Sequence, residues 1–198
     1  MEIVCLDLEG VLVPEIWIEF SQATGIKELK ATTRDIPDYD ELMRQRLGIL
    51  HENGLGLNEI HQTVDGIGPL EGAREFLDTL RESHQVVILS DTFYEFAMPL
   101  MRQLGWPTLF CHRLETDADG VVTGYKLRMN DHKREAVKCF KSLNFRVTAA
   151  GDSYNDTNML GEADKGILFC PPINVMEEFP HFPVVENYND LLAAIREN

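Results

Sequence analysis

Four short apolar runs, separated by helical patterns, restrict the fold more than any other feature of this chain. They are residues 3–8 (IVCLDL), 85–91 (QVVILSD), 146–152 (RVTAAGD) and 165–170 (KGILFC). Each is brief, mostly apolar and rich in branched side chains, as expected for strands buried on both faces of a parallel sheet. Between them, residues 72–83, 94–104 and 131–143 carry helical patterns. Strands that alternate with helices predict an α/β fold with a parallel sheet.

Two segments depart from this alternation. Residues 14–70 contain helical stretches, notably 40–53 and 58–67, and no convincing strand. Roughly fifty residues are too many for one crossover loop, so we expect a helical cap (14–70) inserted into a core made of residues 1–13 and 71–198. Residues 112–128 hold Asp-Ala-Asp-Gly between alternating segments, which predicts a β-hairpin flap.

The formal charge of the chain is −15, from 18 Lys and Arg against 33 Asp and Glu. This charge argues against nucleic acid or an anionic membrane as a partner, because both require a basic surface. It does not exclude an anionic small molecule, since a bound cation inverts the local field. No apolar segment approaches the roughly 20 residues that span a bilayer, and no basic leader opens the chain. We therefore expect a soluble, cytoplasmic protein.

The cysteines and histidines show no spacing typical of metal ligands. The four cysteines lie far apart and are interpreted as small buried hydrophobic residues in a reducing compartment: Cys5, Cys111, Cys139 and Cys170. The six histidines are interpreted as surface or loop residues: His51, His61, His84, His112, His132 and His181. The helical pattern at 131–143 predicts a shared apolar face, made of Ala136, Val137, Phe140 and Leu143.

Polar side chains gather at the carboxyl ends of the predicted strands, where open α/β sheets bind ligands. These residues are Asp7, Glu9, Ser90, Asp91, Asp152, Asn155 and Asp156, with Lys133 in the first turn of the helix before the third strand. Acids this close repel one another and require a cation. All of the ligands would be oxygens, and Mg²⁺ is the hard cation that suits carboxylates and phosphate together.

The order of these residues resembles the motifs of the haloacid dehalogenase (HAD) superfamily. Its DxDx[TV] motif reads Asp7-Leu8-Glu9-Gly10-Val11, and Ser90 and Lys133 match its second and third motifs. The GDxxxD motif runs from Gly151-Asp152 to Asp156. Each motif alone is weak, but four in the right order are specific and cover essentially the whole chain. The resemblance implies a Rossmann-like HAD core with the inserted cap and the hairpin flap.

Further segments resemble the phosphoserine phosphatases of this superfamily. Residues 44–50 (RQRLGIL), Phe93 and the DADGVVTG segment match that family, with Arg46 at its second cap arginine. The ThrH-type enzymes, also described as phosphoserine:homoserine phosphotransferases, resemble this chain in having Glu as the second acid. The resemblance implies O-phospho-L-serine as substrate, L-homoserine as an acceptor and Mg²⁺ as cofactor. A homodimer stays an open option.

The catalytic roles follow from chemistry as well. Asp7 would attack phosphorus and form an aspartyl-phosphate, while Glu9 would protonate the leaving oxygen and then deprotonate the acceptor. Side chains two apart on a strand point the same way, so both acids reach one phosphoryl group. Asp7, the main-chain carbonyl of Glu9 and Asp152 would hold Mg²⁺. Ser90 and Lys133 would bind the phosphate.

The remaining site residues have alternative roles. Asp156 would orient the metal's waters or Lys133, and Asn155 would bond the phosphoryl group or the substrate. Asp91 stands where the family usually has glycine, and it either contacts the substrate ammonium or reshapes the loop. Lys133 has charged neighbours, so an ordinary solvated lysine is the alternative reading of that residue.

A phosphorylated amino acid carries an ammonium and a carboxylate, so its site needs an acid and a guanidinium. Arg46 is the candidate for the carboxylate, with a solvated helix face as the alternative. Glu15 is the candidate for the ammonium, and Glu19 is the second option. Two other functions stay open: a phosphatase of another small phosphate ester, and a receiver-like signalling domain that is phosphorylated on aspartate. Receivers usually place that aspartate after the third strand and lack a large cap, which favours the enzyme.

Overall fold

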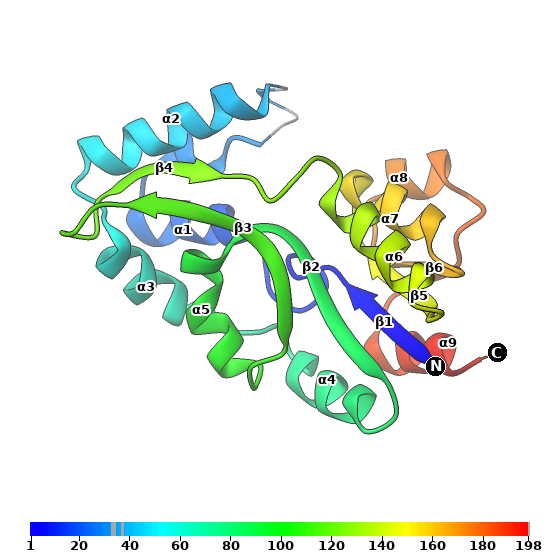
Figure 1. Cartoon of the computed structure of the whole chain (residues 1–198). Helices are drawn as coiled ribbons and strands as arrows, with labels where there is room; N and C mark the ends of the chain where they lie inside the picture. Colours follow the sequence, from blue (N-terminus) through cyan, green and yellow to red (C-terminus); the bar gives the residue numbers. More distant parts are fainter. Residues whose placement is uncertain (33–34, 37, 198) are drawn as a thin grey trace.

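The computed structural model describes residues 1–32, 35–36 and 38–197, and its strands form one twisted sheet (Figure 1). The sheet has seven strands in the order β4-β3-β2-β1-β5-β6-β7. The strands are β1 (Glu2–Leu6), β2 (Gln85–Phe93), β3 (Thr108–Thr116), β4 (Val122–Lys126), β5 (Arg146–Gly151), β6 (Lys165–Phe169) and β7 (Val184–Val185). Neighbouring strands run parallel except β3 and β4, which are antiparallel. The predicted α/β fold is confirmed, and the four predicted strands correspond to β1, β2, β5 and β6.

Helices connect these strands and form the segment between β1 and β2. They are α1 (Ile16–Thr24), α2 (Tyr39–Glu52), α3 (Leu57–Asp65), α4 (Ala73–Arg81), α5 (Tyr94–Gln103), α6 (His132–Ser142), α7 (Thr157–Glu162), α8 (Ile173–Glu178) and α9 (Tyr188–Arg196). Short 3₁₀ turns cover Lys27–Lys30 and Tyr154–Asp156. Among the described helices, none combines the length and the apolar character that crossing a membrane requires.

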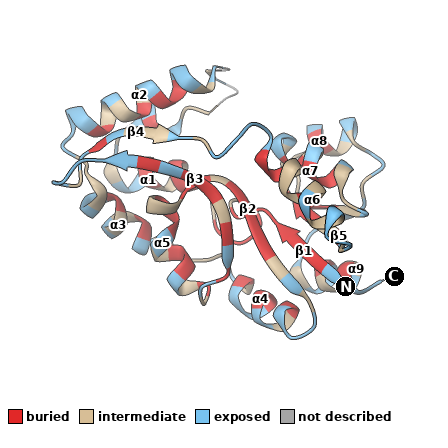
Figure 2. Ribbon diagram, viewed as in Figure 1, coloured by how far each residue is buried: buried red, intermediate tan, exposed pale blue. Residues whose placement is uncertain are grey.

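The sheet is buried on both faces because β1 alternates its side chains between two hydrophobic clusters. Val4 and Leu6 belong to one cluster, which also takes in residues of α4, α5 and α9. Ile3 and Cys5 belong to the other, which takes in residues of α6, α7 and α8. Figure 2 shows the resulting buried stripe through β1 and β2. An apolar run without polar alternation is the sequence form of such a doubly covered strand.

Three sequence-based expectations about burial are wrong. Leu143 is 62% exposed, because α6 ends at Ser142 and Leu143 lies past the last residue of its buried face. All four cysteines are free, as expected, but Cys139 and Cys170 are exposed rather than buried. The prediction that the histidines are surface or loop residues is wrong for His112 and His132, which are 5% and 3% exposed.

The predicted hairpin is confirmed, and its two strands extend the sheet. Strand β3 first pairs in parallel with β2 and then continues into the antiparallel pair with β4. Asp117 closes the turn, because its carboxylate accepts hydrogen bonds from the N–H groups of Asp119 and Val121. The tip is tied to the helical segment by a hydrogen bond from the Leu57 N–H to the Gly120 carbonyl, 2.9 Å long.

Helices α1, α2 and α3 all lie within residues 14–70, where the cap is expected. One hydrophobic cluster nevertheless runs from this segment into the sheet domain. Trp17 of α1 packs against Phe96 of α5, with ring centroids 4.8 Å apart. The division into a core of residues 1–13 and 71–198 and a cap of residues 14–70 therefore stays a prediction.

Candidate active site

The carboxyl ends of β1, β2 and β5 meet at one edge of the sheet, and residues of α1 and α2 also line the site there. A cavity of about 710 Å³ opens there and brings together nearly all of the predicted site residues. Its lining includes Asp7, Glu9, Glu15, Arg46, Ser90, Asp91, Lys133, Asp152 and Asn155. Asp156 is fully buried beneath this lining. Glu19 is not among the described residues that line the cavity, and its carboxylate accepts from Gln22 instead.

Asp7 is buried directly after β1, and its carboxylate already has two partners. Its Oδ1 accepts the N–H of Leu8 at 2.7 Å and lies 3.0 Å from the Lys133 ammonium. Burial, together with the charge of Asp156, raises the pKa of Asp7 well above its ordinary value, although Lys133 opposes this shift. The side chain is thus a carboxylate that a further positive charge would stabilise.

Lys133 is buried among three acids, so the alternative of an ordinary solvated lysine is wrong. Its Nζ lies 2.8 Å from Asp156, 3.0 Å from Asp7 and 3.3 Å from Asp91. Burial alone lowers the pKa of Lys133, but these three carboxylates outweigh burial and raise that pKa well above its ordinary value. Lys133 therefore presents a fixed positive charge beside the oxygen of Asp7.

Asp156 anchors the loop after β5. Its Oδ2 accepts hydrogen bonds from the N–H groups of Asp152 and Ser153, each 3.1 Å long. Its Oδ1 receives Lys133. Of the two predicted roles for Asp156, the geometry favours orientation of Lys133, because both carboxylate oxygens already accept hydrogen bonds from these donors.

Two motif glycines allow the acids to approach one another. A Cβ at Gly10 would overlap the carboxyl group of Asp152, and Gly10 has a φ of +76°. A Cβ at Gly151 would overlap the side chain of Asp156 in the same way. Both glycines belong to the predicted motifs, and a larger residue at either position would collide with an acid of the site.

The acids fit a hard divalent cation. Carboxylate oxygens of Asp7, Asp152 and Asp156 lie within 4.8 Å of one another. Burial and then the charge of Asp156 raise the pKa of Asp152 to about 7, which shows that its negative charge is poorly compensated by the protein. Since Asp156 is engaged by Lys133 and the loop, Asp7 and Asp152 are the side chains best placed to offer oxygens to Mg²⁺.

The side chain of Glu9 reaches the start of α1. Its Oε2 accepts a hydrogen bond from the N–H of Ile16, the first residue of α1, at 2.8 Å. Burial and the nearby Glu15 raise the pKa of Glu9 to about 7, against the opposing effect of the Ile16 bond. A carboxyl group with a pKa near neutrality suits general acid–base catalysis.

Arg46 is 7% exposed and lines the cavity, so the alternative of a solvated helix face is wrong. Its guanidinium lies 4.3 Å from the ring centroid of Trp17, and its Nη2 donates to the Ala31 carbonyl at 2.9 Å. Its Nε has no hydrogen-bond partner among the described residues. The guanidinium is therefore held rigidly at the cavity wall with donor capacity left over. Glu15 lines the same cavity as an exposed side chain.

Ser90 lies in β2 where the pairing with β3 changes register between Leu89 and Phe93. Such irregularities redirect side chains and are frequent beside active sites. Ser90 is 1% exposed, and its Oγ accepts from the N–H of Thr92 at 3.2 Å. Its hydroxyl hydrogen thus remains available as a donor toward the cavity.

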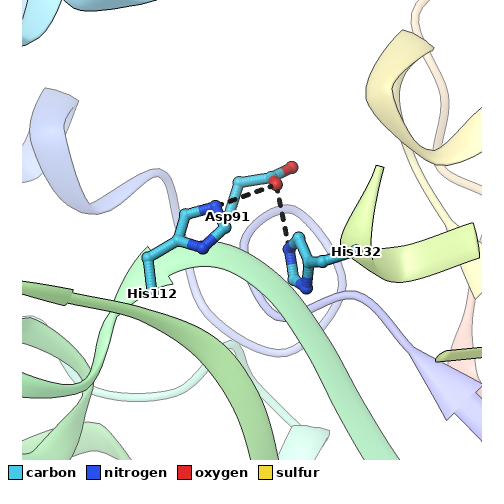
Figure 3. Close-up of side chains that lie close together, drawn as sticks. All are labelled: Asp91, His112 and His132. Atoms are coloured by element: carbon cyan, nitrogen blue, oxygen red, sulfur yellow. Dashed lines mark hydrogen bonds and ion pairs between the residues drawn. The ribbon is translucent and has the colours of Figure 1, made fainter. Parts of the chain in front are cut away.

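Asp91 contacts a pair of residues that no motif in the sequence assigns to the site. Both His112 and His132 turn toward its carboxylate (Figure 3). His132 directly precedes the motif residue Lys133, which is the signal that could have identified it. His112 lies in β3, at the start of the predicted hairpin segment, and no local pattern distinguishes it.

Comparison with known proteins shows the family of the chain. Residues 16–161 match the model of the haloacid dehalogenase-like hydrolases. The chain is 66% identical to phosphoserine phosphatase ThrH of Pseudomonas aeruginosa over 96% of its own length and 93% of that protein. It is 65% identical to a phosphoserine phosphatase of Pseudomonas syringae pv. tomato over 96% of its length and 81% of that protein.

A solved structure has the same fold. It is described as a phospho-aspartyl intermediate analogue of phosphoserine phosphatase, with a TM-score of 0.77 and 21% sequence identity. The match covers 97% of this chain and 97% of that chain. This likeness extends over core, helical segment and hairpin alike. The family model and the two Pseudomonas relatives show that the chain belongs to the haloacid dehalogenase-like hydrolase family, in the group of the ThrH-type phosphoserine phosphatases.

Proposed function

We propose that this protein is a Mg²⁺-dependent phosphatase of O-phospho-L-serine that works through an aspartyl-phosphate. The observation that carries the proposal is the position of Asp7, whose carboxylate lies 3.0 Å from the buried Lys133 ammonium. Asp7 faces the same cavity as Arg46 and Glu15. The names of the two Pseudomonas relatives, both phosphoserine phosphatases, support the choice of substrate.

In the first step a carboxylate oxygen of Asp7 attacks phosphorus. The bond between phosphorus and the serine oxygen breaks, and Glu9 gives its proton to that oxygen. A pKa of about 7 leaves Glu9 partly protonated at neutral pH, as this step requires. Lys133 and the hydroxyl of Ser90 hold the phosphoryl oxygens. Mg²⁺, held by Asp7, Asp152 and the main-chain carbonyl of Glu9, would neutralise charge on the phosphoryl group when bound.

In the second step Glu9 takes a proton from the acceptor hydroxyl, whose oxygen attacks phosphorus and releases Asp7. With water as acceptor the product is inorganic phosphate. With an alcohol the product is a new phosphate ester, and the same residues serve both reactions. We infer that L-homoserine is such an acceptor, which is the finer part of the proposal.

For the substrate's amino-acid part, we assign the carboxylate to Arg46 and the ammonium to Glu15. A guanidinium with fixed geometry suits bidentate binding of a carboxylate. Glu15 is preferred to Glu19 because it lines the cavity, whereas Glu19 contacts Gln22 outside the described lining.

Release of phosphate from phosphoserine, with and without Mg²⁺, tests the proposal. We expect turnover over many enzyme equivalents for the natural chain with Mg²⁺, and loss of turnover in Asp7→Asn. Asp131→Asn is the matched control, because Asp131 lines the same cavity and its carboxylate contacts Asn158. Full activity of Asp7→Asn would refute the nucleophile, and a single turnover would favour a receiver-like phosphorylated domain.

Transfer is tested by adding homoserine to the same reaction and following the products by phosphorus NMR. We expect phosphohomoserine to appear beside inorganic phosphate. Free phosphate alone would remove the transfer activity and leave the hydrolase. Faster release from a sugar phosphate than from phosphoserine would instead favour the alternative of another small phosphate ester.

A further inference from the structure

We propose that His112 and His132 are positioning residues of the phosphoryl-transfer centre. His132 holds the carboxylate of Asp91 by a hydrogen bond and His112 holds it by a longer polar contact, and Asp91 in turn fixes Lys133 and Asn155. This inference rests on the proposed phosphatase reaction and deepens it. It gives Asp91 a role as a third acid that contacts Lys133, together with Asp7 and Asp156.

The two imidazoles approach one oxygen of Asp91 from different elements. His112 belongs to β3 and His132 is the first residue of α6. Their Nε2 atoms lie 3.6 Å and 3.1 Å from Asp91 Oδ1, and the ring centroids are 4.6 Å apart. Figure 3 shows both rings turned toward this carboxylate. Both histidines are buried, whereas the Asp91 side chain lies at the cavity and is 42% exposed.

The other oxygen of Asp91 serves the catalytic side. Its Oδ2 accepts the amide of Asn155 at 2.8 Å and lies 3.3 Å from Nζ of Lys133. Burial raises the pKa of Asp91, but Lys133 and the polar contacts of the two histidines and Asn155 outweigh burial and hold the pKa well below its ordinary value. Asp91 is thus an ionised carboxylate surrounded by donors. A substrate ammonium would have to displace one of them, so the loop-shaping alternative is favoured over an ammonium contact.

Two imidazoles and one carboxylate are also a donor set for a transition metal, and the three ligand atoms lie within 4.8 Å of one another. A contact behind His112 decides against this reading. Its Nδ1 accepts a hydrogen bond from the N–H of Arg128 at 3.1 Å. A neutral imidazole that accepts at Nδ1 carries its proton on Nε2. That proton points to Asp91, so this nitrogen has no lone pair to give to a metal.

His132 shows why the arrangement is more than packing. Its Nδ1 is buried and has no hydrogen-bond partner among the described residues. An unpaired buried nitrogen costs free energy that an apolar side chain would avoid. The polar contact of this ring is the one to Asp91, which the other nitrogen makes. An imidazole at this position therefore gives the chain something that leucine would not, namely a fixed Asp91 beside Lys133.

The consequence concerns Lys133, which forms ion pairs with Asp7, Asp91 and Asp156. Without Asp91 the ammonium can move toward the two remaining acids and away from the phosphoryl group. Loss of such positioning lowers the rate of the chemical step, by about tenfold to a hundredfold. It leaves binding of the amino-acid part of the substrate nearly unchanged.

The test compares Asp91→Asn, His132→Leu and His132→Gln on phosphoserine and on p-nitrophenyl phosphate, which has no ammonium. We expect Asp91→Asn and His132→Leu to lower kcat by a similar factor for both esters, with little change in KM. His132→Gln should recover most of the activity, because its amide can donate where Nε2 does. Asp91→Asn/His132→Leu should be no slower than Asp91→Asn, because His132 acts through Asp91.

His84→Leu is the matched control. His84 also lies near a carboxylate, 3.6 Å from Glu2, but beside the amino ends of β1 and β2, away from the cavity. We expect full activity for it. Thermal unfolding of each variant shows whether a loss reflects folding, and His132→Gln keeps the test decisive if the leucine variant fails to fold.

Other results would overturn the inference. A loss of activity on phosphoserine alone, with a raised KM, would show that Asp91 contacts the substrate ammonium. If the losses of activity in the two single variants multiply in the double variant, His132 does not act through Asp91. Nitrogen NMR of the rings gives a readout without turnover: we expect Nε2–H on His112, shifted in Asp91→Asn. Replacement of this Nε2 proton by Zn²⁺, when Zn²⁺ is added, would indicate a metal site. If the natural chain cleaves p-nitrophenyl phosphate but not phosphoserine, the proposed substrate is wrong. The comparison of the variants on p-nitrophenyl phosphate then still decides the role of Asp91.

Discussion

The carboxylate of Glu9 accepts a hydrogen bond from the main-chain N–H of Ile16, 2.8 Å away. This bond joins the acid after β1 to the first residue of α1, so the proposed proton-transfer group is held by the helical segment above the cavity. Glu has the reach for this contact, and Asp would be one methylene shorter. The second acid of the motif is thereby coupled to the position of α1.

Glu9→Asp should change which acceptor receives the phosphoryl group. The shorter carboxyl group loses the Ile16 N–H and lies nearer the strand, so we expect the ratio of phosphohomoserine to phosphate to fall about tenfold. Phosphorus NMR of both products measures this ratio. Glu9→Gln is the control, because it keeps the length but cannot move a proton, and it should lose both reactions about a hundredfold or more. An unchanged ratio in Glu9→Asp would show that the length of this side chain does not select the acceptor.

Asp7→Asn and Asp156→Asn should change the stability of the metal-free protein in opposite directions. Asp7 is buried beside other acids and its pKa is raised, so removal of its charge should raise the Tm by about a few degrees. Asp156 binds Lys133 and two loop N–H groups, so its replacement should lower the Tm. Differential scanning calorimetry in a chelator measures both. A lower Tm for Asp7→Asn would mean that its bond to Lys133 outweighs the crowding of the acids.

Stability without metal should fall as the pH rises from about 4.5 to about 7. The pKa values of Glu9 and Asp152 are raised to about 7, so between their unfolded and folded pKa values the folded state binds more protons than the unfolded state. The free energy of unfolding therefore decreases with pH across this window. The lowered pKa of Asp91 acts at lower pH and does not affect the comparison.

Mg²⁺ should reverse this loss. It compensates charge that is present only when the acids are ionised, so we expect a larger increase in Tm at about pH 8 than at about pH 5.5. Na⁺ at matched ionic strength is the control for screening. Equal shifts at both pH values would mean that the cation does not bind at Asp7 and Asp152.

Arg46→Lys should weaken binding of phosphoserine. Lysine keeps the charge but loses the planar donors and the stacking on Trp17, so we expect KM to rise about tenfold or more with p-nitrophenyl phosphate unaffected. Arg44→Ala is the matched control from the same helix, because Arg44 is exposed and bonds the Asp40 carbonyl. Equal losses on both esters would assign Arg46 to the structure of α2 rather than to substrate binding.

The sequence by itself determined the parallel sheet and the order of its central strands along the chain, because β1, β2, β5 and β6 are local apolar runs that need no partner to be recognised. It also determined which acids stand at the strand ends, since a carboxyl end is fixed once the strand is. The residues Asp7, Ser90, Lys133 and Asp152 meet in one cavity for this reason.

Tertiary structure alone decided the contacts between segments far apart in the sequence. The start of β3 depends on its pairing with β2, and the burial of Lys133 depends on acids at the carboxyl ends of β1, β2 and β5. The places of His112 and His132 beside Asp91 depend on how β3 and α6 pack at the end of β2. Periodicity records whether a side chain faces inward, but the identity of its partner is set by packing between elements, which no local pattern contains.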